Sequence, residues 1–213
     1  GKSTLISAIA LYMLLADKEP SAECYVAAGD RQQANIIFDV ASSMVRADVQ
    51  LNDNLRVFKN SIIHEKSNSA FKAISAEASS KFGYNASFIC MDEFFVQKDS
   101  QLWDALTTSV GSRRQPLTIA ITTAGYNRES ICFKTEEYGR KVSEGIIKDD
   151  SFYYVKYACP LDVKWDTEEA LRLANPALES GVVKLDYWKR EQEKAMKMPS
   201  YEITFRMLHL NQW

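Results

Sequence analysis

Apolar residues recur along the first fifty positions of the chain in two different rhythms. Over 3–17 they fill most of a helical pattern, which predicts a largely buried helix, and over 31–47 they occupy one face of an amphipathic helix. Between these helices, Glu23 to Ala28 (ECYVAA) is a short apolar run closed by Gly29, which is typical of an inner strand. The alternation of helix and strand indicates an α/β domain.

The middle of the chain changes rhythm. Three short runs, at 55–58, 61–64 and 70–75, predict antiparallel strands at one edge of a sheet. Two longer runs, Ser87 to Met91 and Leu117 to Thr122, are apolar at nearly every position, and a helix is predicted between them over 101–111. Strands that are apolar on both faces indicate a mainly parallel sheet with helices on both faces.

The last third of the chain becomes helical and more charged. A helix is predicted over 130–144 and an alternating strand over 152–158 (FYYVKYA). Beyond Pro160, three further helices are predicted, over 167–174, 185–197 and 201–208. We therefore expect a core domain over 1–159 and a small helical lid or linker over 160–213.

Composition narrows the class of protein. With 213 residues, 46% of them hydrophobic and 25% charged, the chain is typical of an ordinary soluble globular protein. No apolar stretch reaches the roughly 20 residues of a membrane span, so no membrane association is expected. The formal net charge of −2 argues against a broad nucleic-acid-coating surface, so any DNA contact should be local. The cysteines are far apart in sequence and are predicted to be reduced, buried, cytosolic thiols: Cys24, Cys90, Cys132 and Cys159.

The first four residues suggest a phosphate site. Gly1-Lys2-Ser3-Thr4 matches the end of the phosphate-binding loop GxxxxGK[ST], in which backbone amides and the Lys cradle phosphates. A tetrapeptide alone is weak evidence, and a basic helix start would explain it equally well. The apolar helix that follows at once is, however, what the loop geometry requires.

The ends of two later strands carry residue types that a phosphate site of this kind needs. Asp92 and Glu93 follow the apolar run Phe88 to Met91; Asp92 would hold Mg²⁺ and Glu93 would orient the attacking water in phosphoryl transfer. Thr122 and Thr123 end the next strand and could contact the γ-phosphate. Each could instead be a solvated strand end or a plain turn. The order of the three motifs supports them together.

These motifs, and long stretches around them, resemble the ATPase domain of phage large terminases of the HK97-like type. The matching stretches cover nearly the whole chain: GKSTLISAIALYMLL, AAGDRQQANIIFDVASSMVRA, FICMDEF, RRQPLTIAITTAGYNRESIC and FRMLHLNQW. The resemblance implies a P-loop NTPase fold of the RecA-like (ASCE) kind. It also implies ATP hydrolysis that drives double-stranded DNA through a portal ring into a procapsid, and a following RNase H-like nuclease domain.

The resemblance also implies a role for each matched residue. Gly1, Lys2, Ser3 and Thr4, with Thr122 and Thr123, would bind ATP; Ser3 and Asp92 would hold Mg²⁺; Glu93 would be the catalytic acid. The implied partners are double-stranded DNA, the portal protein, the small terminase subunit and further copies in a ring. The expected location is the host bacterial cytoplasm, with the gene in a phage or prophage. Because the strand before Gly1 and the nuclease are absent, we expect this fragment to be inactive.

The arginine that would complete such a site is harder to choose. Ring ATPases commonly take an arginine from the neighbouring subunit. Arg113, Arg114 and Arg128 are the candidates, although arginines at helix ends are more often dipole partners or surface charges. Arg31, which opens a predicted helix, is a further candidate, and Lys81 is a weaker one. His64 and His209 are isolated, and ordinary structural roles are expected for both.

Two other functions fit part of the sequence. A helicase-like nucleic-acid translocase would need a second core or helicase motifs after residue 160, and neither is seen. A truncated, non-catalytic assembly module would be expected to lose costly buried charges, yet Lys2, Asp92 and Glu93 are intact.

Overall fold

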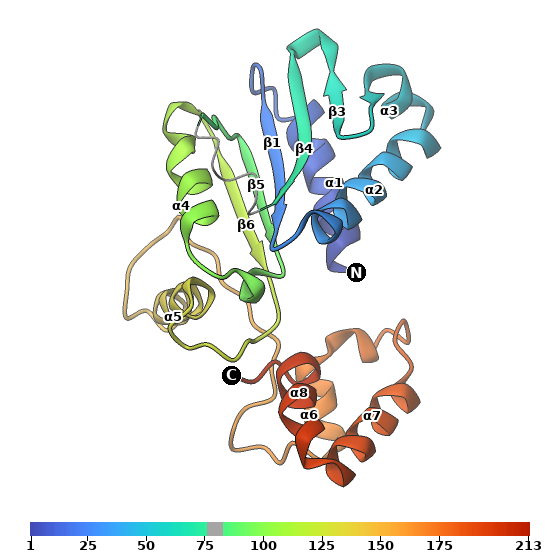
Figure 1. Cartoon of the computed structure of the whole chain (residues 1–213), viewed down its shortest axis with the longest axis vertical. Coiled ribbons are helices and arrows are strands. Elements are labelled where there is room, and N and C mark those ends of the chain that lie inside the picture. The colour runs from blue at the N-terminus through green and yellow to red at the C-terminus, as the bar shows by residue number, and fades with distance from the viewer. Residues whose placement is uncertain (76–82) are drawn as a thin grey trace. The chain divides into compact units, whose positions relative to one another are not determined.

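The computed structural model describes residues 1–75 and 83–213, so Lys81 lies outside the described residues. The chain divides into two compact units, Gly1–Thr122 and Thr123–Trp213, which are described separately (Figure 1). The predicted boundary near residue 160 falls inside the second unit and stays a prediction.

The first unit is built on a six-stranded sheet with the order β2-β3-β4-β1-β5-β6. The strands β4, β1, β5 and β6 are parallel, and the β2–β3 and β3–β4 pairs are antiparallel, as the sequence predicted for one edge. The bounds are β1 Glu23–Ala28, β2 Arg56–Val57, β3 Ser61–His64, β4 Ser69–Ser75, β5 Phe88–Asp92 and β6 Leu117–Ile121.

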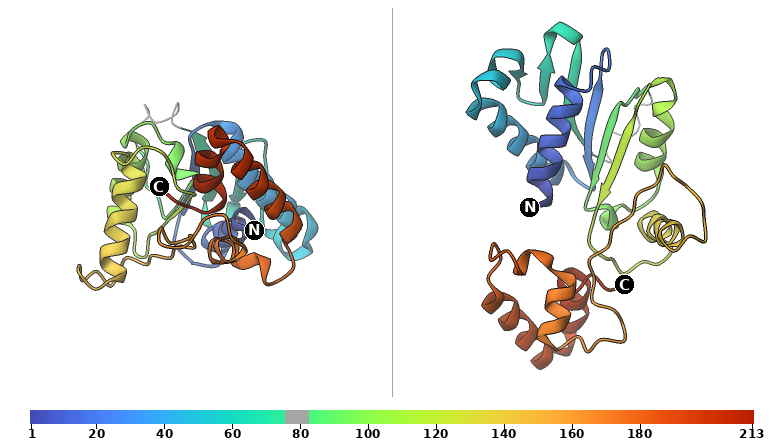
Figure 2. Two further views of the ribbon diagram at one scale, coloured as in Figure 1. Left: turned by 90° about the horizontal axis from the view of Figure 1, so that it is seen from below. Right: turned by 180° about the vertical axis from the view of Figure 1, so that it is seen from behind.

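Helices cover both faces of this sheet (Figures 1 and 2). On one face lie α1 (Lys2–Leu15), α2 (Arg31–Ala47) and the short α3 (Val49–Asn54); on the other lies α4 (Gln101–Thr107), which continues as the 3₁₀ turn Thr108–Ser112. The largest apolar cluster joins α1, α2 and the central strands through fully buried side chains such as Ile6, Ile37, Phe71 and Phe88. The mixed, mainly parallel α/β architecture is therefore as predicted.

The strands differ in how well the helices cover them. All five residues of β5 are buried, and so are five of the six residues of β1, which explains their continuous apolar sequences. In contrast, Leu117, Thr118 and Ala120 of β6 are exposed. The prediction that β6 is covered on both faces is wrong, because β6 is the edge strand of the described sheet.

The second unit is helical. It comprises α5 (Ile131–Ser143), α6 (Glu168–Ala174), the 3₁₀ turn Pro176–Leu178, α7 (Leu185–Lys197) and α8 (Pro199–His209), close to the predicted helices. Its apolar cluster spans Cys159 to Leu210 and centres on fully buried Leu171 and Phe205. Here His209 packs against Trp188 and Phe205, which is the ordinary structural role expected for it.

The predicted strand over 152–158 is absent, since this segment has no strand pairing. It is held against α5 instead: Phe152 stacks edge-to-face on Tyr138, Tyr154 lies over Gly139, and Lys156 pairs with Glu136. The alternation in the sequence therefore records packing on a helix rather than on a sheet.

The four cysteines, Cys24, Cys90, Cys132 and Cys159, are buried thiols, as predicted. Within residues 1–75 and 83–213, no helix is long and apolar enough to cross a membrane.

Candidate active site

The predicted phosphate and metal residues of the first unit, together with Glu93, gather at one edge of its sheet. Because β1, β5 and β6 are parallel, Ala28, Asp92 and Ile121 all end at this edge, and Asp92 is the register partner of Ile121. The helix α1 leads into the opposite, amino end of β1, so its own start lies at the same carboxyl edge, as the N label in Figure 1 shows. The carboxyl edge of a parallel sheet is where such folds bind ligands.

The start of α1 presents unpaired backbone amides and a lysine. Gly1 is the N-cap residue and has no side chain to cap the first turn, which also contains no acidic residue. A helix N-terminus of this kind favours anions. Lys2 and Thr4 are exposed and Ser3 is half-buried. The buried Ser7 hydroxyl lies 2.8 Å from the carbonyl oxygens of both Ser3 and Ile37, which anchors this helix start to α2.

Asp92 carries a buried carboxylate. Its side chain is in a residue only 4% exposed, and this burial raises its pKa above the ordinary value. The backbone amide of Glu93 donates to Oδ1 at 2.9 Å, and this bond and the positive charge of Lys2 both oppose that rise. The carboxylate is therefore held in place by the chain segment that follows it.

Glu93 occupies a strained backbone conformation. Its φ of 46° and ψ of 51° place it in the left-handed region, which costs a non-glycine residue of order 1–3 kcal/mol. Burial raises the pKa of its carboxyl group, and Lys2 acts in the opposite direction. Such strain at a strand end, beside a cation, is typical of a functional position.

Thr122 connects the end of β6 to the loop after Glu93. Its hydroxyl accepts a hydrogen bond of 3.0 Å from the backbone amide of Phe95. A shift in the position of Thr122 would therefore move the turn that follows the acidic pair. Thr123 is the first residue of the second unit, so its placement relative to this edge is not described.

The residues of this edge fit a magnesium–nucleotide complex better than a metal bound by protein alone. Among the described residues, no group of three or more His, Cys, Asp or Glu side chains could hold a metal ion. Mg²⁺ typically takes one or two protein ligands and completes its shell with phosphates and water. The buried Asp92 carboxylate and the half-buried Ser3 hydroxyl are two oxygen groups that could serve as that minimal set of ligands.

Arg113 lies away from the acidic pair. Its guanidinium is almost fully buried, forms an ion pair with buried Glu19 at 3.5 Å, and donates to the carbonyl oxygens of Pro20, Ser21 and Asn85. These partners precede β1 and β5, so they mark the amino edge of the sheet, opposite Asp92. This geometry favours a structural role for Arg113 over the predicted catalytic one.

The other two predicted arginines have different surroundings. Arg114 is exposed in the turn before β6, at the amino edge. Arg128 belongs to the second unit, where it donates to the Trp213 carbonyl oxygen at 3.1 Å and lies 5.9 Å from the Phe133 ring centre. Arg31 donates to Asn60 at 2.8 Å. An arginine at the amino edge could act only on a site in another subunit.

The structure adds one residue beside this edge that sequence reasoning missed. Gly29, directly after β1, lies so close to the loop after Glu93 that a Cβ there would be 3.0 Å from Val96 Cγ1. The glycine that closes the apolar run Glu23 to Ala28 was the available signal, but it does not reveal which segment approaches it.

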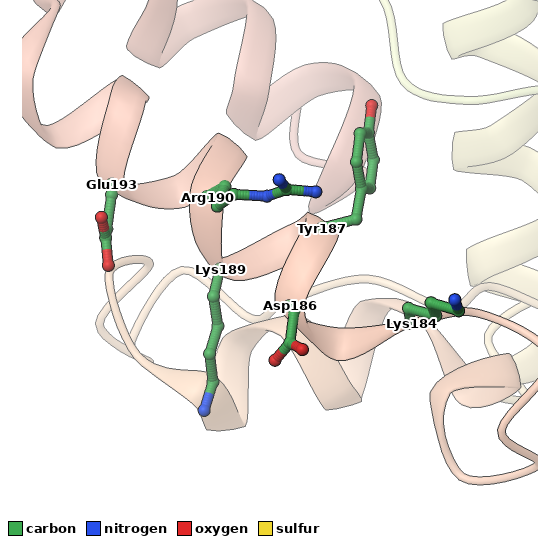
Figure 3. Close-up of a pocket in the computed structure, with 6 residues that line it drawn as sticks. All are labelled: Lys184, Asp186, Tyr187, Lys189, Arg190 and Glu193. Atoms are coloured by element: carbon green, nitrogen blue, oxygen red, sulfur yellow. The ribbon is translucent and has the colours of Figure 1, made fainter.

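A pocket outside this edge lies on α7 in the second unit (Figure 3). It is lined by side chains of both charges: Lys184, Asp186, Tyr187, Lys189, Arg190 and Glu193. In Figure 3 these side chains spread in different directions from the helix. The pocket contains none of the predicted site residues.

The parallel sheet, the helix start with Gly1-Lys2-Ser3 and the acidic pair at the end of β5 define a P-loop nucleotide-binding core. The model of the terminase large-subunit ATPase domain matches residues 1–141. The chain belongs to this family.

Individual relatives agree with this assignment. The large terminase subunit of Enterobacteria phage HK97 is 31% identical over 217 residues, which cover 100% of this chain and 42% of the relative. Protein YmfN of Escherichia coli K12 is 29% identical over 123 residues, which cover 58% of this chain and 27% of that protein. The chain thus spans less than half the length of these relatives.

Solved structures show the same fold. The crystal structure of the HK97 large terminase superposes with a TM-score of 0.86 at 30% identity, covering 100% of this chain and 44% of that one. The ATPase domain of the Thermus phage P74-26 large terminase gives a TM-score of 0.60 at 15% identity and covers 100% of this chain and 84% of that one. At that identity, the second likeness supports the fold alone.

Proposed function

We propose that this chain is the ATP-hydrolysing motor domain of a viral large terminase and drives double-stranded DNA into a procapsid. The observation that carries the proposal is the buried Asp92, followed by strained Glu93, with the charge of Lys2 acting on both carboxylates. An acidic pair with one buried and one half-buried member, near a helix N-terminus, suits a triphosphate and its metal.

Each residue has a distinct task in this proposal. The amides at the start of α1 and the Lys2 ammonium bind the phosphate oxygens, and the Ser3 hydroxyl and Asp92 hold Mg²⁺. When bound, Mg²⁺ neutralises charge on the phosphates. Glu93 accepts a hydrogen bond from the attacking water and orients it toward the γ-phosphorus. Thr122 passes a change at this edge to the loop through Phe95.

The proposed partners follow from the family rather than from this chain alone. They are double-stranded DNA, the portal protein, the small terminase subunit and further copies of the chain in a ring, in the cytoplasm of the bacterial host. A ring would allow Arg114 or Arg128 of one subunit to complete the site of another. With a net charge of −2, DNA binding by this domain should be weak, local and salt-sensitive, with a salt slope that corresponds to fewer than about ten phosphates.

We also propose that residues 160–213 form a lid or linker that leads toward a nuclease domain. Its support is a separate apolar cluster that runs from Cys159 to Leu210. Limited proteolysis of the full-length protein should cut near residue 160 or after 213. Cleavage within 87–123 at a comparable rate would contradict the assignment.

The function is tested by Glu93→Gln in the full-length protein. The variant keeps the shape and hydrogen bonding of Glu93 but loses its charge, so ATP should still bind with near-normal affinity while single-turnover hydrolysis falls about 10²- to 10⁴-fold. Glu179→Gln, an exposed acid in the second unit, is the matched control and should behave as wild type. Hydrolysis by Glu93→Gln within a few-fold of wild type would assign the role to another residue.

The same preparation separates the two other functions. A non-catalytic assembly module would show no magnesium-dependent ATP hydrolysis in the wild-type protein. A helicase-like translocase would hydrolyse ATP and separate DNA strands, whereas a packaging motor should move intact duplex. Strand separation without duplex translocation would therefore favour the helicase.

A further inference from the structure

A single 3₁₀ turn, Phe94–Val96, follows Glu93 directly. Its backbone is closed by two hydrogen bonds, from the Val96 amide to the Glu93 carbonyl oxygen at 2.9 Å and from the Gln97 amide to the Phe94 carbonyl oxygen at 3.2 Å. The left-handed backbone of Glu93, with a φ of 46°, is kept by a non-glycine residue only where its surroundings hold it. The contacts of this turn therefore decide where the Glu93 side chain leaves the backbone.

An aromatic contact holds the first residue of the turn. Phe94 is 2% exposed, and the centre of its ring lies 4.5 Å from that of the Trp103 ring in α4, with 32° between the two ring planes. Aromatic rings at this separation attract one another by more than their buried area alone would give. Trp103 itself is half-buried. The start of the turn is thus fixed to α4.

The helix α4 is in turn anchored at its other end. Ser109, in the 3₁₀ turn that continues α4, accepts a hydrogen bond of 3.3 Å from the Ala86 amide. Arg113, which follows that turn, donates to the Asn85 carbonyl oxygen at 2.9 Å. Because Asn85 and Ala86 lead into β5, α4 is held by the chain that enters this strand, and Trp103 contacts the turn that leaves it.

We propose that Trp103 is a positioning residue of the ATPase site, which acts through Phe94 to hold the turn that places the Glu93 carboxylate. The inference rests on the proposed function, in which Glu93 orients the attacking water. Displacing a reacting group by about 1 Å can lower a rate on the order of 100-fold. The other contacts of the turn, with the ends of β6 and β1, should keep it formed when the Trp103 ring is lost, so the expected result is a shift rather than unfolding.

The test compares Trp103→Leu with Trp103→Phe in the full-length protein. Leucine keeps an apolar side chain but removes the ring, whereas phenylalanine keeps a ring that can pack on Phe94. Leu106→Ala is the matched control, because it removes a fully buried side chain from the same helix and leaves both members of the aromatic pair in place. Hydrolysis assays give kcat and the KM for ATP, and thermal unfolding gives the folded fraction of each variant.

We expect Trp103→Leu to lower kcat about 10- to 100-fold per folded molecule with little change in the KM for ATP, and Trp103→Phe to restore most of kcat. In a Glu93→Gln background, Trp103→Leu should add no further fall, because it acts through Glu93. Hydrogen exchange at the Val96 amide should quicken in Trp103→Leu and stay unchanged in Leu106→Ala. If Trp103→Leu does not fold, Trp103→Met takes its place in the same assays.

Three results would overturn the role of Trp103. The first is turnover by Trp103→Leu within a few-fold of wild type, and the second is an equal fall in kcat per folded molecule in Leu106→Ala. The third is an undiminished further fall in the Glu93→Gln background. In each case, magnesium-dependent hydrolysis by the wild-type protein would still support the proposed function, whereas its absence from the wild-type protein would contradict that function itself.

Discussion

In the first unit all residues from Phe88 to Asp92 are buried in a paired strand, whereas the extended segment over 152–158 of the second unit leaves Tyr153, Val155 and Tyr157 exposed. The first is covered by helices on both faces and bonded to strands on both sides. The second rests on one helix through aromatic contacts and the Lys156–Glu136 pair. A parallel sheet therefore holds its strand ends more firmly than a helix surface holds an extended chain.

The difference in how firmly the backbone is held suits the two units to different roles. Chemistry that depends on the position of two carboxylates needs elements whose backbone is fixed, and the end of β5 provides them. The second unit offers exposed aromatic and charged side chains on a small helical core, which suits contacts with partners. Variants of the full-length protein can test whether the sheet edge of the first unit and the helical core of the second unit are independent.

Destabilising the apolar core of the second unit should leave the strands of the first unit folded. Phe205 is fully buried there, so Phe205→Ala should destabilise this unit by about 3–5 kcal/mol through lost burial and a cavity. Hydrogen exchange measured by mass spectrometry should show the loss of protection within 159–210. Loss of protection spread equally over β1 and β5 would mean that the two units unfold together. Phe71→Ala, in the first unit, is the reciprocal control.

Arg113 should matter for stability rather than for catalysis in its own subunit. Arg113→Met leaves Glu19 buried without its cation and leaves three carbonyl oxygens without a donor, so unfolding should become about 3–5 kcal/mol easier. Arg114→Met should leave stability unchanged, since Arg114 is exposed. Chemical denaturation and single-turnover hydrolysis per folded molecule distinguish the two. Unaltered stability in Arg113→Met would reopen its catalytic role.

The ionised Asp92 carboxylate should lower the free energy of unfolding when no ligand is bound. Burial raises its pKa, so the ionised form is less favourable in the folded chain than in the unfolded one. Asp92→Asn should therefore stabilise the nucleotide-free protein by about 0.5–2 kcal/mol at neutral pH while abolishing metal-dependent turnover. As pH falls through the raised pKa, the wild-type carboxyl takes up a proton and the difference should shrink. A difference that grows toward acid would contradict this reading.

The smallest expected change in stability concerns Thr122. Thr122→Val keeps the shape but removes the acceptor for the Phe95 amide, so the loop after Glu93 should lose about 0.5–1.5 kcal/mol. Hydrogen exchange at Phe95 should quicken. Thr118→Val, on the exposed part of the same strand, is the control. If Phe95 exchanges equally fast in both variants, Thr122 does not connect β6 to the loop.

The fold class, most helices and the residues at the ends of the central strands could be predicted from the sequence. Runs such as Phe88 to Met91, apolar at every position, are typical of strands covered on both faces, so the pattern indicated a parallel sheet, although it failed for the exposed edge strand β6. The motif at Gly1-Lys2-Ser3 and the acidic pair then pointed to one edge of that sheet, because parallel strands end together.

Which side chains contact one another could be known only from the fold. The alternating pattern over 152–158 is the same whether the segment pairs with a strand or packs on a helix, and the contacts with α5 show that it packs on a helix. The sequence could not show that Arg113 is a buried structural residue, because its partners Glu19 and Asn85 are distant in sequence. The approach of Gly29 to Val96 joins two segments for the same reason: local sequence sets the turn after each strand, whereas strand order sets which turns lie side by side.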